Sequence, residues 1–161
     1  MFISDLLREK PVIVSCELFP PKRGTELSNA LEVVERTVAL RPDFVSVTCS
    51  AKAAGNNLAM AEQVRACGAT PLTHLTCVGA SKAGIDAMLD TLTLRRVCNL
   101  LALRGDIPAE GPVPDGYAYA SALVSRIKAR GDFCVGAACY PEGHVESAGL
   151  AQDVIHLKEK V

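Results

Sequence analysis

Residues 70–106, TPLTHLTCVGASKAGIDAMLDTLTLRRVCNLLALRGD, contain one complete unit of strand, helix and strand. The two ends, 70–79 and 99–106, are short apolar runs typical of buried strands. Between them, residues 82–96 place apolar side chains at helical spacing, and Ser81 is a typical helix N-cap. Two strands joined through a helix predict parallel pairing with a right-handed crossover.

The same alternation of strand-like and helix-like segments continues on both sides of this unit. Further strands are predicted at 11–19, 43–50 and 132–140. Further helices are predicted at 25–40, 57–67, 117–130 and 147–161, the last with Leu150, Val154, Leu157 and Val161 on its inward face. The sequence therefore predicts a single α/β domain over residues 1–161, built from five consecutive βα units.

Two architectures compete for a parallel sheet of this kind. A doubly wound sheet has helices on both faces and continuous apolar strands, whereas a (β/α) barrel keeps one face for polar groups near the strand ends. Here polar residues alternate with apolar ones toward the ends of four strands, and FPPKRG (19–24) follows the first strand in place of a Gly-rich dinucleotide-binding turn. These features favour a barrel of the TIM type.

A closed barrel of this type needs eight units and about 250 residues. We therefore expect the 161 residues to form an open half-barrel without the later units. The apolar side chains expected on its open inner face are those of Ile13, Phe19, Phe44, Leu72 and Leu100. Exposed apolar faces and strand edges promote association, so we also expect a homo-oligomer.

The composition excludes several classes of protein. With 17 Lys and Arg against 18 Asp and Glu, the net charge is −1, which provides no basic field for nucleic acid or an anionic membrane surface. The seven Cys include no C-x-x-C pair, which indicates reduced thiols in a cytoplasmic protein. The charged N-terminus (1–11) does not resemble a signal peptide, and no apolar run reaches the roughly 20 residues of a membrane-spanning helix.

Glu17 is the first candidate for chemistry, because it lies within an apolar strand just before Phe19-Pro20-Pro21. A carboxylate at an inward strand position is costly to desolvate unless it is paired or functional, and such a group suits a general acid. The alternative is a structural ion pair, for which Arg104 is a candidate partner.

Other polar groups fall at the ends of later strands, where barrel enzymes carry their working residues. His74 is one, although a lone His is more often a hydrogen-bonded core residue, and with Cys77 it offers too few ligands for zinc. Residues 104–106 (RGD) and 140–144 (YPEGH) suit a polar ligand, and the former could equally be a simple tight turn. Spacing predicts that Asp153, His156 and Lys160 share one helical face, a pattern that is most often solvated.

Several of these strings, in this order and spacing, resemble the methylenetetrahydrofolate reductase family. They are CELFPPK (16–22), RPDFVSVT (41–48), THLTCVG (73–79), LLALRGD (100–106), YAYASALV (117–124), FCVGAACYPEGH (133–144) and LKEKV (157–161). The resemblance implies a flavoprotein barrel that uses FAD to pass a hydride from NADH or NADPH to methylenetetrahydrofolate. The product is methyltetrahydrofolate, which serves one-carbon metabolism and methionine supply.

The resemblance also implies roles for individual residues. Glu17 matches the family's catalytic acid, which assists opening of the folate's imidazolidine ring. Asp106 matches the acid near the flavin and the pterin. The positions that match contacts to FAD are Thr48, Ala51, His74, Arg104, Gly105, Asp106, Ala120, Tyr140, His144, Asp153 and Lys160. No metal is implied.

The sequence departs from the family pattern at several positions. Residues 55–58 (GNNL) stand where the family often has Arg-Asp-Arg-Thr, His156 where Asn is common, and Glu159 where a basic residue is common. Residues 49–54 (CSAKAA) replace the Tyr-Gly-Ala-Gly-Gly-Ser that usually follows the family's Thr. The family also continues beyond its counterpart of LKEKV into three more strands, which carry two Gln and an Arg that contact the substrates. A catalytically inactive fragment, acting at most as a flavin- or partner-binding module, is therefore an alternative interpretation, and a barrel methyltransferase acting on a related pterin is a third.

Overall fold

The computed structural model describes residues 1–22, 26–49, 55–107, 111, 113–143 and 147–160. In this part of the chain, five strands form one parallel sheet in sequence order: β1 (Ser15–Leu18), β2 (Phe44–Val47), β3 (Thr70–Thr76), β4 (Asn99–Leu103) and β5 (Cys134–Ala137). The helices are α1 (Ile3–Glu9), α2 (Leu27–Ala39), α3 (Asn56–Ala66), α4 (Lys82–Leu94), α5 (Ala120–Arg130) and α6 (Leu150–Lys160).

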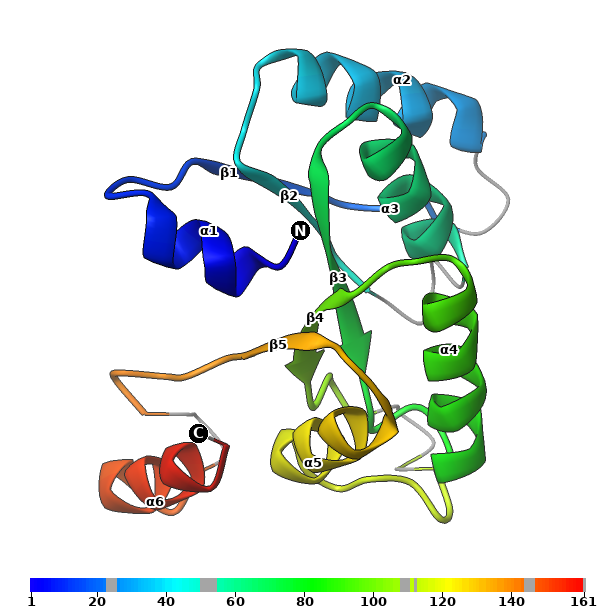
Figure 1. Ribbon diagram of the computed structural model, residues 1–161. Coiled ribbons are helices and arrows are strands. Elements are labelled where there is room, and N and C mark those ends of the chain that lie inside the picture. The colour runs from blue at the N-terminus through cyan, green and yellow to red at the C-terminus, as the bar shows by residue number, and fades with distance from the viewer. Residues whose placement is uncertain (23–25, 50–54, 108–110, 112, 144–146, 161) are drawn as a thin grey trace.

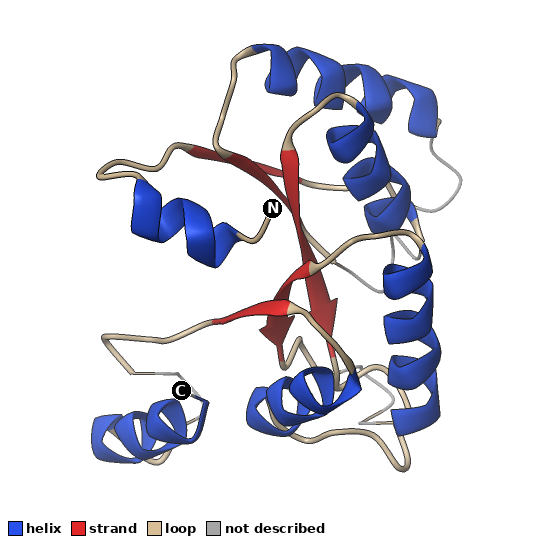
Figure 2. Cartoon of the chain, in the orientation of Figure 1, coloured by secondary structure: helices blue, strands red, loops and turns tan. Residues whose placement is uncertain are grey.

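The sheet is open, with β1 and β5 at its two edges. Helices α2 to α5 follow one face of the sheet, and α1 lies against the opposite, inner face (Figures 1 and 2). Sequential parallel strands with helices on one side are the arrangement of a TIM barrel. The predicted α/β half-barrel is therefore confirmed, and each predicted strand contains an observed one.

The core lies between the sheet and helices α2 to α5, in two clusters of buried side chains. Val45 and Val47 of β2 pack with Val34 of α2 and with α3 in the first cluster. The second cluster joins β3 and β4 to α4 and α5, and Leu100 lies at its centre with no exposed surface. The expectation that Leu100 faces the open inner face is therefore wrong, because it shares the helix-covered side with Ala102.

The helices begin and end close to their predicted limits. Ser81 caps α4 as predicted, because its Oγ accepts a hydrogen bond from the backbone nitrogen of Gly84 at 3.1 Å. The expectation for α6 is wrong: none of its described side chains is buried, and Leu150 and Val154 are more than half exposed. Helix α6 packs against α5, and its described apolar residues stay exposed to solvent.

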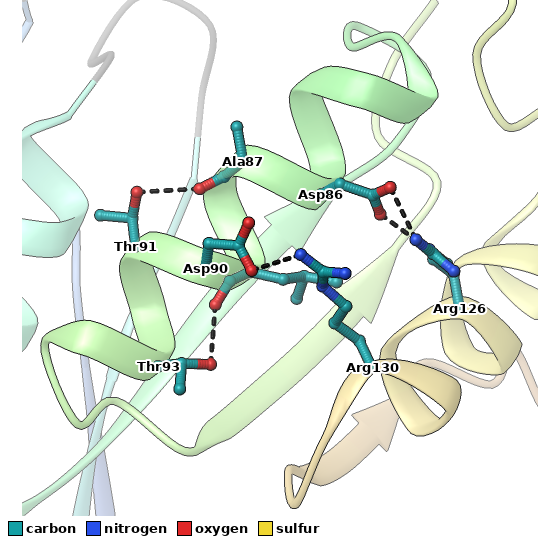
Figure 3. Close-up of polar contacts among 8 residues, drawn as sticks. Asp86, Ala87, Asp90, Thr91, Thr93, Arg126 and Arg130 are labelled. Atoms are coloured by element: carbon teal, nitrogen blue, oxygen red, sulfur yellow. Dashed lines mark hydrogen bonds and ion pairs between the residues drawn. The ribbon is translucent and has the colours of Figure 1, made fainter.

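Two ion pairs join α4 to α5 along their exposed sides (Figure 3). Arg126 donates from Nε and Nη2 to the two carboxylate oxygens of Asp86 at 2.7 and 2.6 Å, and Arg130 pairs with Asp90 one turn further on. The Arg126 guanidinium holds the pKa of the Asp86 carboxyl below its usual range. Because both helices present their charges four residues apart, the two pairs fix α5 in register with α4.

Helix α1, which the sequence did not predict, closes the amino-terminal end of the inner face. Asn99, the first residue of β4, is almost fully buried and holds the helix in position. Its Oδ1 accepts from the backbone nitrogen of Ile3 at 2.9 Å, and its Nδ2 donates to the carbonyl oxygens of Met1 and Pro71 at 3.2 and 3.3 Å. Ile3 and Leu6 are the buried residues of α1.

We expect Asn99→Ala to detach α1 and to lower the free energy of unfolding by about 2 kcal/mol, because buried backbone groups would lose their partner. Urea unfolding measures the change, and amide hydrogen exchange at Ile3 and Leu6 should accelerate. The exposed Asn29→Ala in α2 is the control and should change stability by less than about 0.5 kcal/mol. Unchanged protection of Ile3 in Asn99→Ala would contradict this anchoring role.

Candidate active site at the carboxyl edge of the sheet

Three polar side chains meet on the inner face of β1, β2 and β3. The parallel register pairs Glu17 with Ser46, and Ser46 with Leu72. Side chains two residues apart on a strand share a face, so His74 projects beside them, one step nearer the carboxyl ends of the strands. Glu17 and His74, which the sequence singled out separately, are therefore neighbours across a central serine.

The contacts within this group lie between 2.8 and 3.6 Å. Ser46 Oγ lies 2.8 Å from His74 Nε2, and it donates to Glu17 Oε2 at 3.5 Å. His74 Nε2 is 3.6 Å from the same Glu17 oxygen. Ser46 and His74 are only 6% and 7% exposed, whereas 49% of the Glu17 side chain is exposed. The group therefore has two buried polar members and one that reaches solvent.

Burial decides the charge of His74. Desolvation lowers the pKa of its imidazole, and the negative charge of Glu17 offsets that effect only in part. His74 is accordingly neutral near pH 7, with one ring nitrogen as donor and the other as acceptor. A neutral imidazole beside a carboxylate can position that carboxylate without forming a salt bridge.

Glu17 does not match its predicted environment. The sequence placed it in a desolvated strand, but β1 is an edge strand and half of the side chain reaches solvent. Its neighbours are Ser46 and His74, so the observed partners differ from the Arg104 considered as a structural alternative. An accessible carboxylate held on one side is suited to exchanging a proton with a bound molecule.

The end of β4 makes a tight turn against β3. The Arg104 carbonyl accepts from the backbone nitrogens of Cys77 and Val78, at 3.2 and 3.0 Å. Gly105 has a φ of +82°, and a Cβ there would lie 2.9 Å from Cβ of Thr76. Only glycine fits this left-handed position without strain. The turn leaves Asp106 exposed at the carboxyl edge.

Other predicted cofactor contacts lie at the same edge. Thr48 is half-buried and continues the pairing of β2 with β1, since its backbone nitrogen donates to Leu18 at 3.0 Å. Ala120 is buried at the start of α5, and Tyr140 follows β5 with about half of its surface exposed. Ala51 and His144 lie outside the residues that the structure describes.

The predicted row on α6 is turned toward the protein instead of lying on a fully solvated face. Lys160 Nζ donates to the carbonyl oxygen of Ala138 at 3.1 Å, just beyond the carboxyl end of β5. The His156 ring lies 6.2 Å from the Tyr119 ring that precedes α5. Asp153 is half-buried, and its Oδ2 lies 3.6 Å from the point where a Cβ of Gly143 would be. Helix α6 thus carries a carboxylate and an ammonium to the edge of the sheet.

Sequence reasoning gave no role to Ser46, which lies between the acid and the imidazole. Its signal was a single polar residue inside the apolar run FVSV (44–47). Asn57 was also missed: its Nδ2 donates to the carbonyl oxygen of His74 at 3.5 Å.

Cys77 contributes to the core and not to the site. It is fully buried in the cluster beneath α4, and this burial raises the pKa of its thiol. Within the described ranges, no group of three or more His, Cys, Asp and Glu side chains could hold a metal ion. Over those same ranges, no helix has the length and apolar character needed to cross a membrane.

Comparison with known proteins identifies relatives of the chain. A model of the methylenetetrahydrofolate reductase family matches residues 2–161. The 5,10-methylenetetrahydrofolate reductases of Pectobacterium carotovorum subsp. carotovorum and Escherichia coli (strain K12) are 34% and 31% identical over 151 residues. Each alignment covers 92% of this chain and 50% of the relative. The methylenetetrahydrofolate reductase (NADH) 1 of Arabidopsis thaliana is 34% identical, with 99% of this chain and 30% of that protein covered. The chain thus spans about half the length of the bacterial relatives.

Stability should depend on pH through His74. An unfolded His has a pKa of about 6.5, and the folded value is lower, so the ring is almost uncharged in both states above about pH 7.5. As the pH falls below 6.5, the unfolded state binds the proton first, and we expect the free energy of unfolding to fall by at most about 1.4 kcal/mol per pH unit. Urea unfolding between pH 7.5 and 5 measures this slope. His74→Gln should flatten it and His156→Gln should not; equal slopes in the two variants would contradict the assignment.

Gly105→Ala should destabilise the protein by about 2 kcal/mol, because alanine is strained at this φ and its Cβ would collide with Thr76. Gly68→Ala is a matched control, since Gly68 has a φ of +90° and nothing within 4 Å of its Cβ position. Thermal unfolding of both variants separates the two effects. Equal losses would mean that the contact with Thr76 contributes nothing.

Proposed function

Because this chain belongs to the methylenetetrahydrofolate reductase family, we propose that it contributes Glu17 as the general acid in the reduction of methylenetetrahydrofolate to methyltetrahydrofolate. The observation that carries the proposal is the position of Glu17. It lies on the inner face of the sheet, near the carboxyl edge where barrel enzymes bind their substrates, with a carboxylate that is half exposed and held on one side.

The proton would move to the nitrogen that leaves when the folate's imidazolidine ring opens. Both contacts made by Glu17 within the described residues use Oε2, so Oε1 is the oxygen that remains for the substrate amine. Protonating a leaving amine makes it a better leaving group and gives an electrophilic iminium. Hydride addition to that carbon completes the methyl group.

We propose FAD as the cofactor, and the residues at the carboxyl edge fit it. Arg104 and Lys160 are cationic donors suited to a pyrophosphate, and Asp153 is a carboxylate suited to ribose hydroxyls. Tyr140 offers an accessible ring. When bound, FAD carries the hydride from NADH or NADPH to the folate. The remaining proposed contacts are Thr48, Ala51, His74, Gly105, Asp106, Ala120 and His144.

Asp106 has a separate proposed role. Its carboxylate is exposed at the end of β4, across the edge from Glu17. There it would accept hydrogen bonds from the pterin and add a negative charge near the flavin. We further propose a cytoplasmic homo-oligomer. The proposed hydride donor is NADH or NADPH, and the Arabidopsis relative is named for NADH.

Glu17→Gln tests the proposed function. We expect NADH or NADPH to bleach the flavin absorbance at the normal rate, because that step needs no proton from Glu17, while reoxidation by methylenetetrahydrofolate slows by at least about 100-fold. Stopped-flow absorbance measures the two half-reactions separately.

Glu32→Gln, on the exposed side of α2, is the matched control and should leave both half-reactions unchanged. Equal slowing of both half-reactions in Glu17→Gln would make Glu17 a structural residue. If the unmodified protein binds flavin but does not reduce methylenetetrahydrofolate, the proposed activity is overturned and a flavin-binding module is favoured.

A further inference from the structure

We propose that Ser46 and His74 are positioning residues for Glu17, with His74 in the tautomer that carries its hydrogen on Nε2. In this arrangement His74 donates to Ser46 Oγ, and Ser46 donates its own hydroxyl hydrogen to Glu17 Oε2. The hydrogen-bonded chain is a property of the fold; only its catalytic consequence rests on the proposed function.

The count of donors and acceptors selects this tautomer. An ionised carboxylate accepts hydrogen bonds only, and a serine hydroxyl has one hydrogen to donate. If His74 Nε2 carried no hydrogen, the Ser46 hydrogen would be drawn to it at 2.8 Å, and Glu17 Oε2 would face two acceptors at 3.5 and 3.6 Å. With the hydrogen on Nε2, each contact pairs a donor with an acceptor.

The surroundings keep this chain of hydrogen bonds in one arrangement. Ser46 and His74 are almost fully buried on adjacent paired strands, so neither side chain can turn to water for a partner. Among the described residues, Glu17 is the charged group whose field changes the pKa of His74. The neighbouring helix α3 contributes a neutral group, the Asn57 amide, which donates to the backbone carbonyl oxygen of His74. The neutral imidazole therefore serves as a fixed donor.

The consequence is a single preferred position for an otherwise mobile acid. Glu17 lies on an edge strand with half of its side chain in solvent, and a free carboxylate there would sample several rotamers. A donor fixed on β2 restrains Oε2, while Oε1 makes neither of these two contacts. Removing that donor should slow the proton-dependent step and leave the other unchanged.

Two-bond ¹H–¹⁵N NMR of the uniformly labelled protein tests the tautomer without turnover. We expect the His74 pattern of a hydrogen on Nε2, with a ring N–H signal protected from exchange. In Ser46→Ala this signal should broaden or vanish, because the ring loses its acceptor. Thr73→Val is the matched control. It removes a buried hydroxyl that has no hydrogen-bond partner among the described residues, on the opposite face of the adjacent strand β3. A hydrogen on Nδ1 in the unmodified protein would overturn the proposal.

Half-reaction kinetics test the consequence. Ser46→Ala should slow the folate step about ten- to hundredfold, the range expected for losing one hydrogen bond to a charged group, with the nicotinamide step unchanged. Ser46→Thr keeps the hydroxyl and should recover most of the rate, whereas an equal loss in both half-reactions would overturn the positioning role. If the protein reduces no folate at all, the proposed function fails, and the NMR result still decides whether the chain of hydrogen bonds exists.

Discussion

Burial of one face of the parallel sheet is the constraint on which the rest of the molecule depends. Val45, Val47, Leu75, Leu100 and Ala102 all project to the side covered by α2 to α5, and all are buried. Side chains alternate between the two faces along a strand. Because these residues point toward the helices, their sequence neighbours must point to the inner face of the sheet. Glu17, Ser46 and His74 share their face for this reason, before any direct interaction between them is considered.

The sequence predicts the parts of the fold that follow from periodicity. Apolar alternation located all five strands and five of the six helices in the described chain, and Ser81 marked the start of α4. Helix α1 was not predicted, because it is short and is held by Asn99, a residue far away in the sequence whose role leaves no local pattern. The burial of α6 was predicted wrongly for a related reason: helical spacing shows which residues share a face, but it does not show whether anything packs there.

The candidate site was predictable as a set of strand ends and not as a set of contacts. Glu17 and His74 were each identifiable from polar residues at inner-face positions and from the resemblance to a known family. Their closeness depends on the β2–β3 register, which aligns Ser46 with Leu72 and so brings His74 one step beyond it. The signal from Ser46 was weak, because a single serine in a strand is common, and its role follows only from its two partners in the structure.

The energetics of this site tie Ser46 and His74 to each other. Each buries a polar group on the inner face of the sheet, where a lost hydrogen bond leaves its partner with the desolvation cost of about 1–3 kcal/mol. Their 2.8 Å contact gives each of these buried groups a hydrogen-bond partner. Glu17 needs no such compensation because it reaches solvent from an edge strand. The hydrogen bond between Ser46 and His74 therefore contributes to the stability of the fold. Glu17, which reaches solvent, remains free to exchange its proton with a bound molecule.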